Sequence, residues 1–120
     1  MPTNAEQYTV GIDFGTLSGR AVVVRVADGA IVGEAVHYYE HGVMDRTLAA
    51  GDGRELPPDY ALQVPDDYRQ VLRTAVPDAV AASGVAPAGI VGVGIDFTSA
   101  TVLVTDADGV PLCETDRFRD

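Results

Sequence analysis

The sequence predicts an α/β protein with one mixed sheet, in which three antiparallel strands are followed by a crossover helix and a strand parallel to the first. Three patterns carry this prediction: β-branched runs separated by short turns over residues 8–39, apolar residues at helical spacing over 65–83, and a second β-branched run over 89–97. With 120 residues, of which 47% are hydrophobic, the chain has the size and apolar content of one folded domain.

The first strand, over residues 8–14, alternates its side chains between two faces. Its apolar and aromatic side chains share one face, while Gly11 and Asp13 lie on the other. A β-branched run over 20–26, a turn at 27–29 and a strand from Ile31 to about Tyr39 complete an antiparallel meander.

Residues 40–64 contain glycines and prolines without a clear period and predict a long loop, of a length that is usually functional. Pro65 then begins a helix with two acids in its first turn. Pro77 lacks the amide that would bond to the Arg73 carbonyl, so we expect a kink or a break there. Gly84 is a natural stop for this helix.

The strand over 89–97 repeats the pattern of the first, with an apolar face opposite Gly92, Gly94 and Asp96. Because a helix connects the two strands, we expect them to be parallel neighbours and both apolar faces to be packed in the core. A second hairpin is expected after it, with strands over 101–105 and 111–114 around a turn at 106–109.

The tetrapeptide Gly-Ile-Asp-Phe occurs twice, over 11–14 and 94–97, each time at the end of a strand and before hydroxyl residues. Two neighbouring parallel strands that each end in an aspartate predict a site at that edge of the sheet. Beyond the first copy, glycines and hydroxyls suit a phosphate-binding turn, in which Asp13 would hold a hydrated Mg²⁺ and the phosphates would lie at Gly15, Thr16 and Ser18.

Arg20 begins the next strand and either reaches the phosphates or pairs with an acid. The turn itself also fits a polar hairpin without any ligand. In the second copy, Asp96 with Thr98, Ser99 and Thr101 suits the hydroxyls of a sugar or polyol, or else simply caps a strand end.

Composition excludes several classes of function. A net charge of −10 opposes binding to nucleic acid or to an anionic membrane, and it argues against a two-metal nuclease of the ribonuclease H type. All eight basic residues are arginine, which excludes a P-loop kinase because that motif requires a lysine. No apolar run is long enough to span a membrane.

Three further side chains are assigned structural roles. The single cysteine, Cys113, forms no intrachain disulfide and is expected in the core, and its isolation favours a cytoplasmic protein. His37 and His41 have no second metal-type ligand at a suitable spacing, so both are expected to be structural.

The run from Val10 to Ala21 closely resembles the opening of the FGGY carbohydrate kinases, members of the actin-like ATPase superfamily, whose fold is related to that of ribonuclease H. The stretches 41–45, 61–63 and 93–101 extend the resemblance, which runs from about Tyr8 to Phe118. It implies ATP-dependent phosphorylation of the terminal hydroxyl of ribulose, as used in arabinose catabolism.

The same resemblance implies roles for single residues. It makes Asp13 the Mg²⁺-associated carboxylate of the first phosphate motif, with the following turn at the phosphates of ATP. It places a segment on the sugar side of a cleft, formed by Asp96, Thr98, Ser99, Ala100 and Thr101.

Family members have two actin-like domains, and residues 1–120 match only the N-terminal part of the first. The resemblance therefore places the catalytic base, the second phosphate motif and the adenosine pocket beyond residue 120. We predict that these 120 residues alone do not phosphorylate ribulose and that the remainder of the kinase chain is their partner, with the oligomeric state open. The alternatives are a non-catalytic sugar- or nucleotide-binding module of the same fold, or an FGGY kinase for another sugar.

Overall fold

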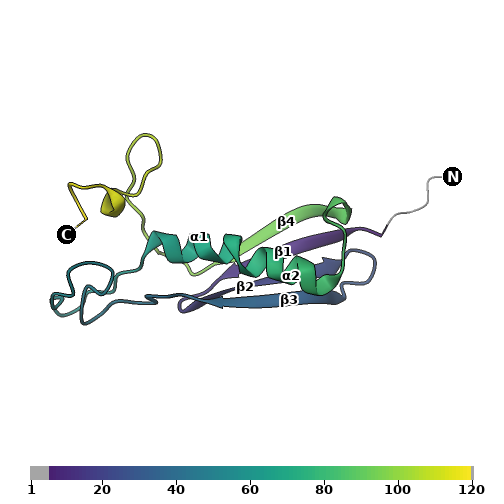
Figure 1. Ribbon diagram of the computed structural model, residues 1–120, viewed down its shortest axis with the longest axis horizontal. Helices are drawn as coiled ribbons and strands as arrows, with labels where there is room; N and C mark the ends of the chain where they lie inside the picture. The colour runs from purple at the N-terminus through teal and green to yellow at the C-terminus, as the bar shows by residue number, and fades with distance from the viewer. Residues whose placement is uncertain (1–5, 120) are drawn as a thin grey trace.

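Four strands form one mixed sheet in residues 6–119, the part of the chain that the computed structural model describes (Figure 1). They are β1 (Tyr8–Phe14), β2 (Ser18–Arg25), β3 (Ile31–Tyr38) and β4 (Ile90–Phe97), in the spatial order β3-β2-β1-β4. The pairs β1–β2 and β2–β3 are antiparallel, and β4 is parallel to β1. The predicted meander and crossover are therefore confirmed.

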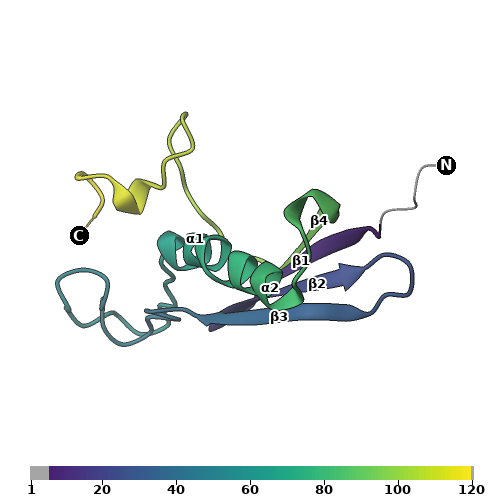
Figure 2. The ribbon, with the colours of Figure 1, turned by 45° about the vertical axis from the view of Figure 1, so that its right-hand side comes forward.

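Two helices, α1 (Pro65–Arg73) and α2 (Ala75–Ser83), lie on one side of this sheet (Figure 2). The expected interruption occurs at Thr74, three residues before Pro77, so that the proline lies in the first turn of α2, where its missing amide removes no helical hydrogen bond. Gly84 ends α2 in the left-handed conformation, with φ 68°. A short 3₁₀ helix, η1 (Pro87–Gly89), leads into β4.

The core lies between the helices and the strands β1 and β2, and it also contains Tyr39, the residue that follows β3. Its buried members, which share this single interface, are Val10, Ile12, Ala21, Val23, Tyr39, Val71, Ala75 and Ala79.

Two sheet glycines allow the helices to approach closely. A Cβ built on Gly19 would lie 2.6 Å from Val71 Cγ1 of α1, and one built on Gly33 would lie 2.7 Å from Ser83 Cβ of α2.

The apolar face of β4 is exposed, which makes one expectation wrong. Val91, Val93, Ile95 and Phe97 retain between 57% and 67% of their accessible surface. In the parallel register, Val93 lies beside Val10 and Ile95 beside Ile12, so this face is on the helix side of the sheet. The helices, however, pack mainly on β2 and β3 and leave this face of β4 uncovered (Figures 1 and 2).

The long segment over 40–64 forms an irregular ribbon. Backbone bridges join Met44 to Leu62 and Thr47 to Glu55, and no regular strand forms in this segment. The ribbon extends beyond the end of the sheet at which β1 and β4 finish (Figure 1).

The expected second hairpin is present only as a turn. Thr105 and Pro111 form a single bridge, and the 3₁₀ helix η2 (Leu112–Glu114) replaces the predicted return strand. An isolated pair of short strands is marginal without a third strand or a helix to pack on, and Val102 is 84% exposed. Cys113 is exposed as well, so its predicted place in the core is wrong.

Candidate functional site

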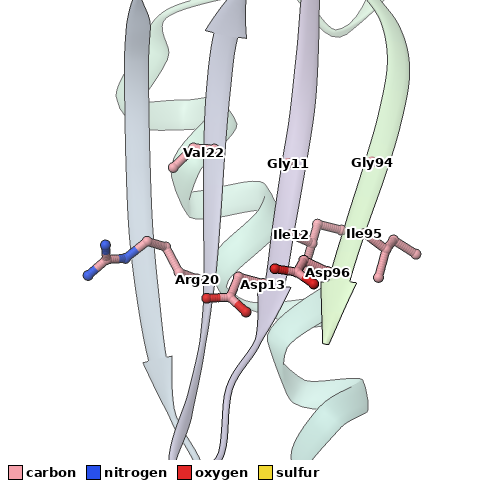
Figure 3. Close-up of a pocket in the computed structure, with 8 residues that line it drawn as sticks. All are labelled: Gly11, Ile12, Asp13, Arg20, Val22, Gly94, Ile95 and Asp96. Carbon is pink, nitrogen blue, oxygen red and sulfur yellow. The ribbon is translucent and has the colours of Figure 1, made fainter. Parts of the chain in front are cut away.

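The two repeated aspartates lie side by side at the ends of β1 and β4. Asp13 and Asp96 are direct partners in the parallel register, and both carboxylates are exposed on the side of the sheet opposite the helices (Figure 3). They line a hollow of about 370 Å³ together with Gly11 and Gly94. The predicted meeting of two strand-end carboxylates at one edge is therefore present in the structure.

Glycines provide the open space of this hollow. A Cβ built on Gly94 would meet no described atom within 4 Å, and one built on Gly11 would meet only Val22 Cγ2, at 3.1 Å. Because both positions lack a side chain, a ligand can approach the backbone beside the carboxylates.

Arg20 lines the same hollow but turns its guanidinium away from the two aspartates, across β3 (Figure 3). It forms no ion pair with an acid anywhere in residues 6–119. Of the two roles expected for this residue, pairing with a described acid is thus absent from the structure.

The turn from β1 to β2 is closed by a hydrogen bond from the Gly15 amide to the Ser18 carbonyl, at 2.9 Å. This amide, expected among the phosphate donors, is therefore engaged inside the turn. Thr16 is exposed, and Ser18, which is half-buried, is the first residue of β2.

Three side chains that the sequence did not indicate support this turn from the helix side. Tyr39 donates its hydroxyl to the Gly15 carbonyl at 2.9 Å, and Gln63 donates its amide to the Thr16 carbonyl at 3.2 Å. Tyr68 in turn donates to the Gln63 side-chain oxygen at 2.8 Å. No local pattern reveals these pairs, since Gln63 and Thr16 are 47 residues apart.

Among contacts within residues 6–119, the hydroxyl cluster after β4 is anchored at its first residue. Thr98 donates its amide to the Phe14 carbonyl at 3.0 Å, which ties the exits of β4 and β1 together. The Asp96 carboxylate accepts the Phe97 amide at 2.9 Å. Beyond Thr98, the residues Ser99, Ala100 and Thr101 form an exposed segment that leaves the sheet, and Ala100 adopts a φ of 65°.

His41 has a structural partner, as expected of a histidine without metal-type neighbours. Asp67, only 4% exposed in the first turn of α1, accepts the His41 amide at 3.1 Å and lies 3.0 Å from His41 Nδ1. This pair fastens the start of the 40–64 ribbon to α1. His37 lies within β3, and residues 6–119 contain no group of three or more side chains placed to hold a metal ion.

Burial of the phenol is the main reason that the pKa of Tyr39 is raised to about 12. The neighbouring Tyr68 and the carboxylates of Asp13 and Asp67 also contribute to this rise. The hydroxyl therefore keeps its proton at neutral pH and serves as a donor to the turn.

The fold and the site together describe an α/β protein in which two strand-end carboxylates lie beside a glycine- and hydroxyl-rich turn. The comparisons with known proteins found relatives that share one name, ribulokinase. The chain is 56% identical to the ribulokinase of Mycolicibacterium smegmatis over 99% of its own length and 21% of that protein. It is 49% identical to the ribulokinase of Shouchella clausii over 90% of the chain and 19% of that protein.

A third match has a similar extent: the chain is 49% identical to the ribulokinase of Geobacillus thermodenitrificans over 95% of its length and 20% of that protein. The chain thus spans about a fifth of the length of the curated relatives it matches, and it corresponds to their N-terminal part. No protein-family model matches it. These matches make the chain similar to the N-terminal part of proteins named ribulokinase.

Across residues 6–119, neither helix has the length and apolar character needed to cross a membrane.

Proposed function

We propose that the full-length protein is an ATP-dependent kinase that phosphorylates the terminal hydroxyl of ribulose in the cytoplasm, as a step of arabinose catabolism. The observation that carries this proposal is the in-register pairing of Asp13 with Asp96, directly beside the glycine- and hydroxyl-rich turn. The relatives named ribulokinase, at 49–56% identity in three organisms, support the choice of sugar.

In this proposal Asp13 holds Mg²⁺, with water molecules completing the coordination of the ion. An exposed carboxylate beside an open hollow fits this ion, which binds oxygen ligands and usually keeps several waters. The triphosphate of ATP lies against Gly15, Thr16 and Ser18. Arg20 has its guanidinium free of described acids and is available to a phosphate.

Asp96 and the segment of Thr98, Ser99, Ala100 and Thr101 face the sugar. Phosphoryl transfer of this type depends mainly on positioning and on stabilising charge, together with a base near the attacking hydroxyl. Residues 1–120 supply no such base in the proposed scheme, so this chain alone does not turn over ribulose. The base and the adenosine pocket come from the remainder of the kinase chain.

We also propose that residues 1–120 are the N-terminal part of the first of two actin-like domains. Two observations support an incomplete domain: the apolar face of β4 is uncovered, and the radius of gyration is 17.9 Å, whereas a compact domain of this length has about 14 Å. Downstream residues then cover β4, where the row from Val91 to Phe97 offers an apolar surface.

Replacing Asp13 by asparagine in the full-length protein tests the proposed function. We expect kcat/KM for ribulose with Mg·ATP to fall by about a hundredfold or more, as large as the loss when one electrostatic contact to a transition state is removed. Asp28→Asn is the matched control, because Asp28 lies in the turn at the opposite end of the sheet and should leave the rate within about twofold. Undiminished activity of Asp13→Asn would show that the site is wrongly assigned.

A further inference from the structure

The turn between β1 and β2 is held by its carbonyl groups. Three consecutive carbonyls each accept one hydrogen bond from outside the turn: Gly15 from the Tyr39 hydroxyl at 2.9 Å, Thr16 from the Gln63 amide at 3.2 Å, and Leu17 from the Tyr39 amide at 3.0 Å. All three donors come from residues 39–63, on the side of the turn that faces the protein.

The geometry of the peptide bond determines where the N–H groups of the turn point. In a trans peptide the carbonyl and the N–H of the same unit point in opposite directions. Because the carbonyls of Gly15 and Thr16 are drawn toward the protein, the N–H groups of Thr16 and Leu17 are turned away from it. Successive outward N–H groups of this kind form a site for an anion.

The donors are themselves held in place. Tyr68 donates to Gln63 Oε1 at 2.8 Å, which orients the Gln63 amide so that its nitrogen faces the turn. The rings of Tyr39 and Tyr68 pack with their centroids 5.2 Å apart, and Phe14, at the end of β1, lies 5.8 Å from Tyr68. Tyr39 is 8% exposed, so its hydroxyl has little water to compete for the bond to Gly15.

We propose that Tyr39, Gln63 and Tyr68 are positioning residues that hold the turn with its Thr16 and Leu17 amides directed at the phosphates of the bound nucleotide. This inference rests on the proposed function and adds residues that contact neither nucleotide nor sugar. Their effect is to fix the backbone before the ligand arrives, which lowers the ordering cost of binding.

The test uses the full-length protein and compares Tyr39→Phe and Tyr68→Phe with Tyr60→Phe. Tyr60 is a matched control because it is half-exposed and its hydroxyl makes no hydrogen bond within residues 6–119. For Tyr39→Phe we expect the Kd of Mg·ADP by calorimetry, and the KM for Mg·ATP, to rise about three- to tenfold, the range that one neutral hydrogen bond supports. The KM for ribulose should stay unchanged.

A purely structural role would instead lower the amount of folded protein and hence kcat, with the nucleotide Kd and KM unaltered, and that result would overturn the proposal. If Tyr39→Phe folds poorly, Gln63→Leu removes the donor to Thr16 at a half-buried position, and an unchanged Kd for Mg·ADP in that variant would overturn the proposal equally. Wild-type protein that binds no nucleotide would refute the proposed function itself, whereas normal wild-type binding with unaffected variants refutes only the positioning roles.

Discussion

The contact between Gly19 of β2 and Val71 of α1 permits a sharp test of how the helix layer packs. A Cβ added at Gly19 would lie 2.6 Å from Val71 Cγ1, closer still to Cγ2, and 3.0 Å from Cβ. Carbon atoms in a well-packed core are separated by about 3.5 to 4.0 Å. Gly19→Ala therefore forces α1 away from the sheet, and we expect it to lower the free energy of unfolding by about 1 to 3 kcal/mol.

Val71→Ala is the second arm of the experiment. It removes two buried methyl groups, each worth about 0.8 kcal/mol of transfer free energy, and leaves a cavity, so we expect a loss of about 2 to 3 kcal/mol. In the double variant the alanine at position 19 occupies part of the space that the two methyl groups leave. The double loss should then be smaller than the sum of the single losses by about 1 to 2 kcal/mol.

Urea denaturation of the 120-residue chain, followed by far-UV circular dichroism, measures these three free energies. Gly94→Ala is the control for adding a methyl group to a sheet glycine, because a Cβ there meets no described atom within 4 Å and should change stability by less than about 0.5 kcal/mol. Losses that add within about 0.5 kcal/mol would show that Gly19 and Val71 are not in the contact described.

Three further predictions follow from other features of the structure. In the full-length kinase, Gly94→Ala should leave stability unchanged and yet reduce kcat/KM by about tenfold or more, because the added methyl group projects into the hollow. Full activity of this variant would show that no ligand approaches the backbone at Gly94. Ile95→Thr should lower the free energy of unfolding by less than about 0.5 kcal/mol in the 120-residue chain, where Ile95 is exposed, but by more than about 1 kcal/mol in the full-length protein. Equally small losses in urea titrations of both proteins would contradict the proposal that downstream residues cover β4. Hydrogen bonds from Gln70 and Arg69 hold the pKa of Asp66 at about 2, below its ordinary 3.8, so its contribution to stability is present above pH 3.8 and is lost as the pH falls toward 2. Asp66→Asn should therefore flatten the decline in the urea midpoint between pH 4 and 2, and a decline as steep as that of the wild type would refute this role.

Local patterns in the sequence predicted the strands, the parallel crossover and the meeting of Asp13 with Asp96. Each depends on side-chain alternation or on the order of elements along the chain, and both are readable from neighbouring residues. The break near Pro77 and the helix end at Gly84 were predicted for the same reason, because proline and glycine restrict or free the backbone at their own positions.

What the sequence did not reveal depends on contacts between distant segments. Alternation shows that one face of β4 is apolar, but whether Ile95 is covered depends on where the helices pack, and they pack mainly on β2 and β3. The support of the turn by Tyr39 and Gln63 is likewise set by where the 40–64 ribbon folds back. The second hairpin failed because Thr105 and Pro111 have no sheet on which to extend their single bridge.

The open edge of β4 bears on how such a protein is synthesised. In the order β3-β2-β1-β4 this strand has a neighbour on one side only, and its exposed apolar row lies along the same edge. Chains are made from the N-terminus at about 5–20 residues per second, and relatives about five times as long would need tens of seconds more after β4 is complete. During that time an unpaired apolar edge is a template for pairing between nascent chains. The interval between the completion of β4 and the synthesis of any segment that covers it is therefore the stage at which this edge is most open to pairing.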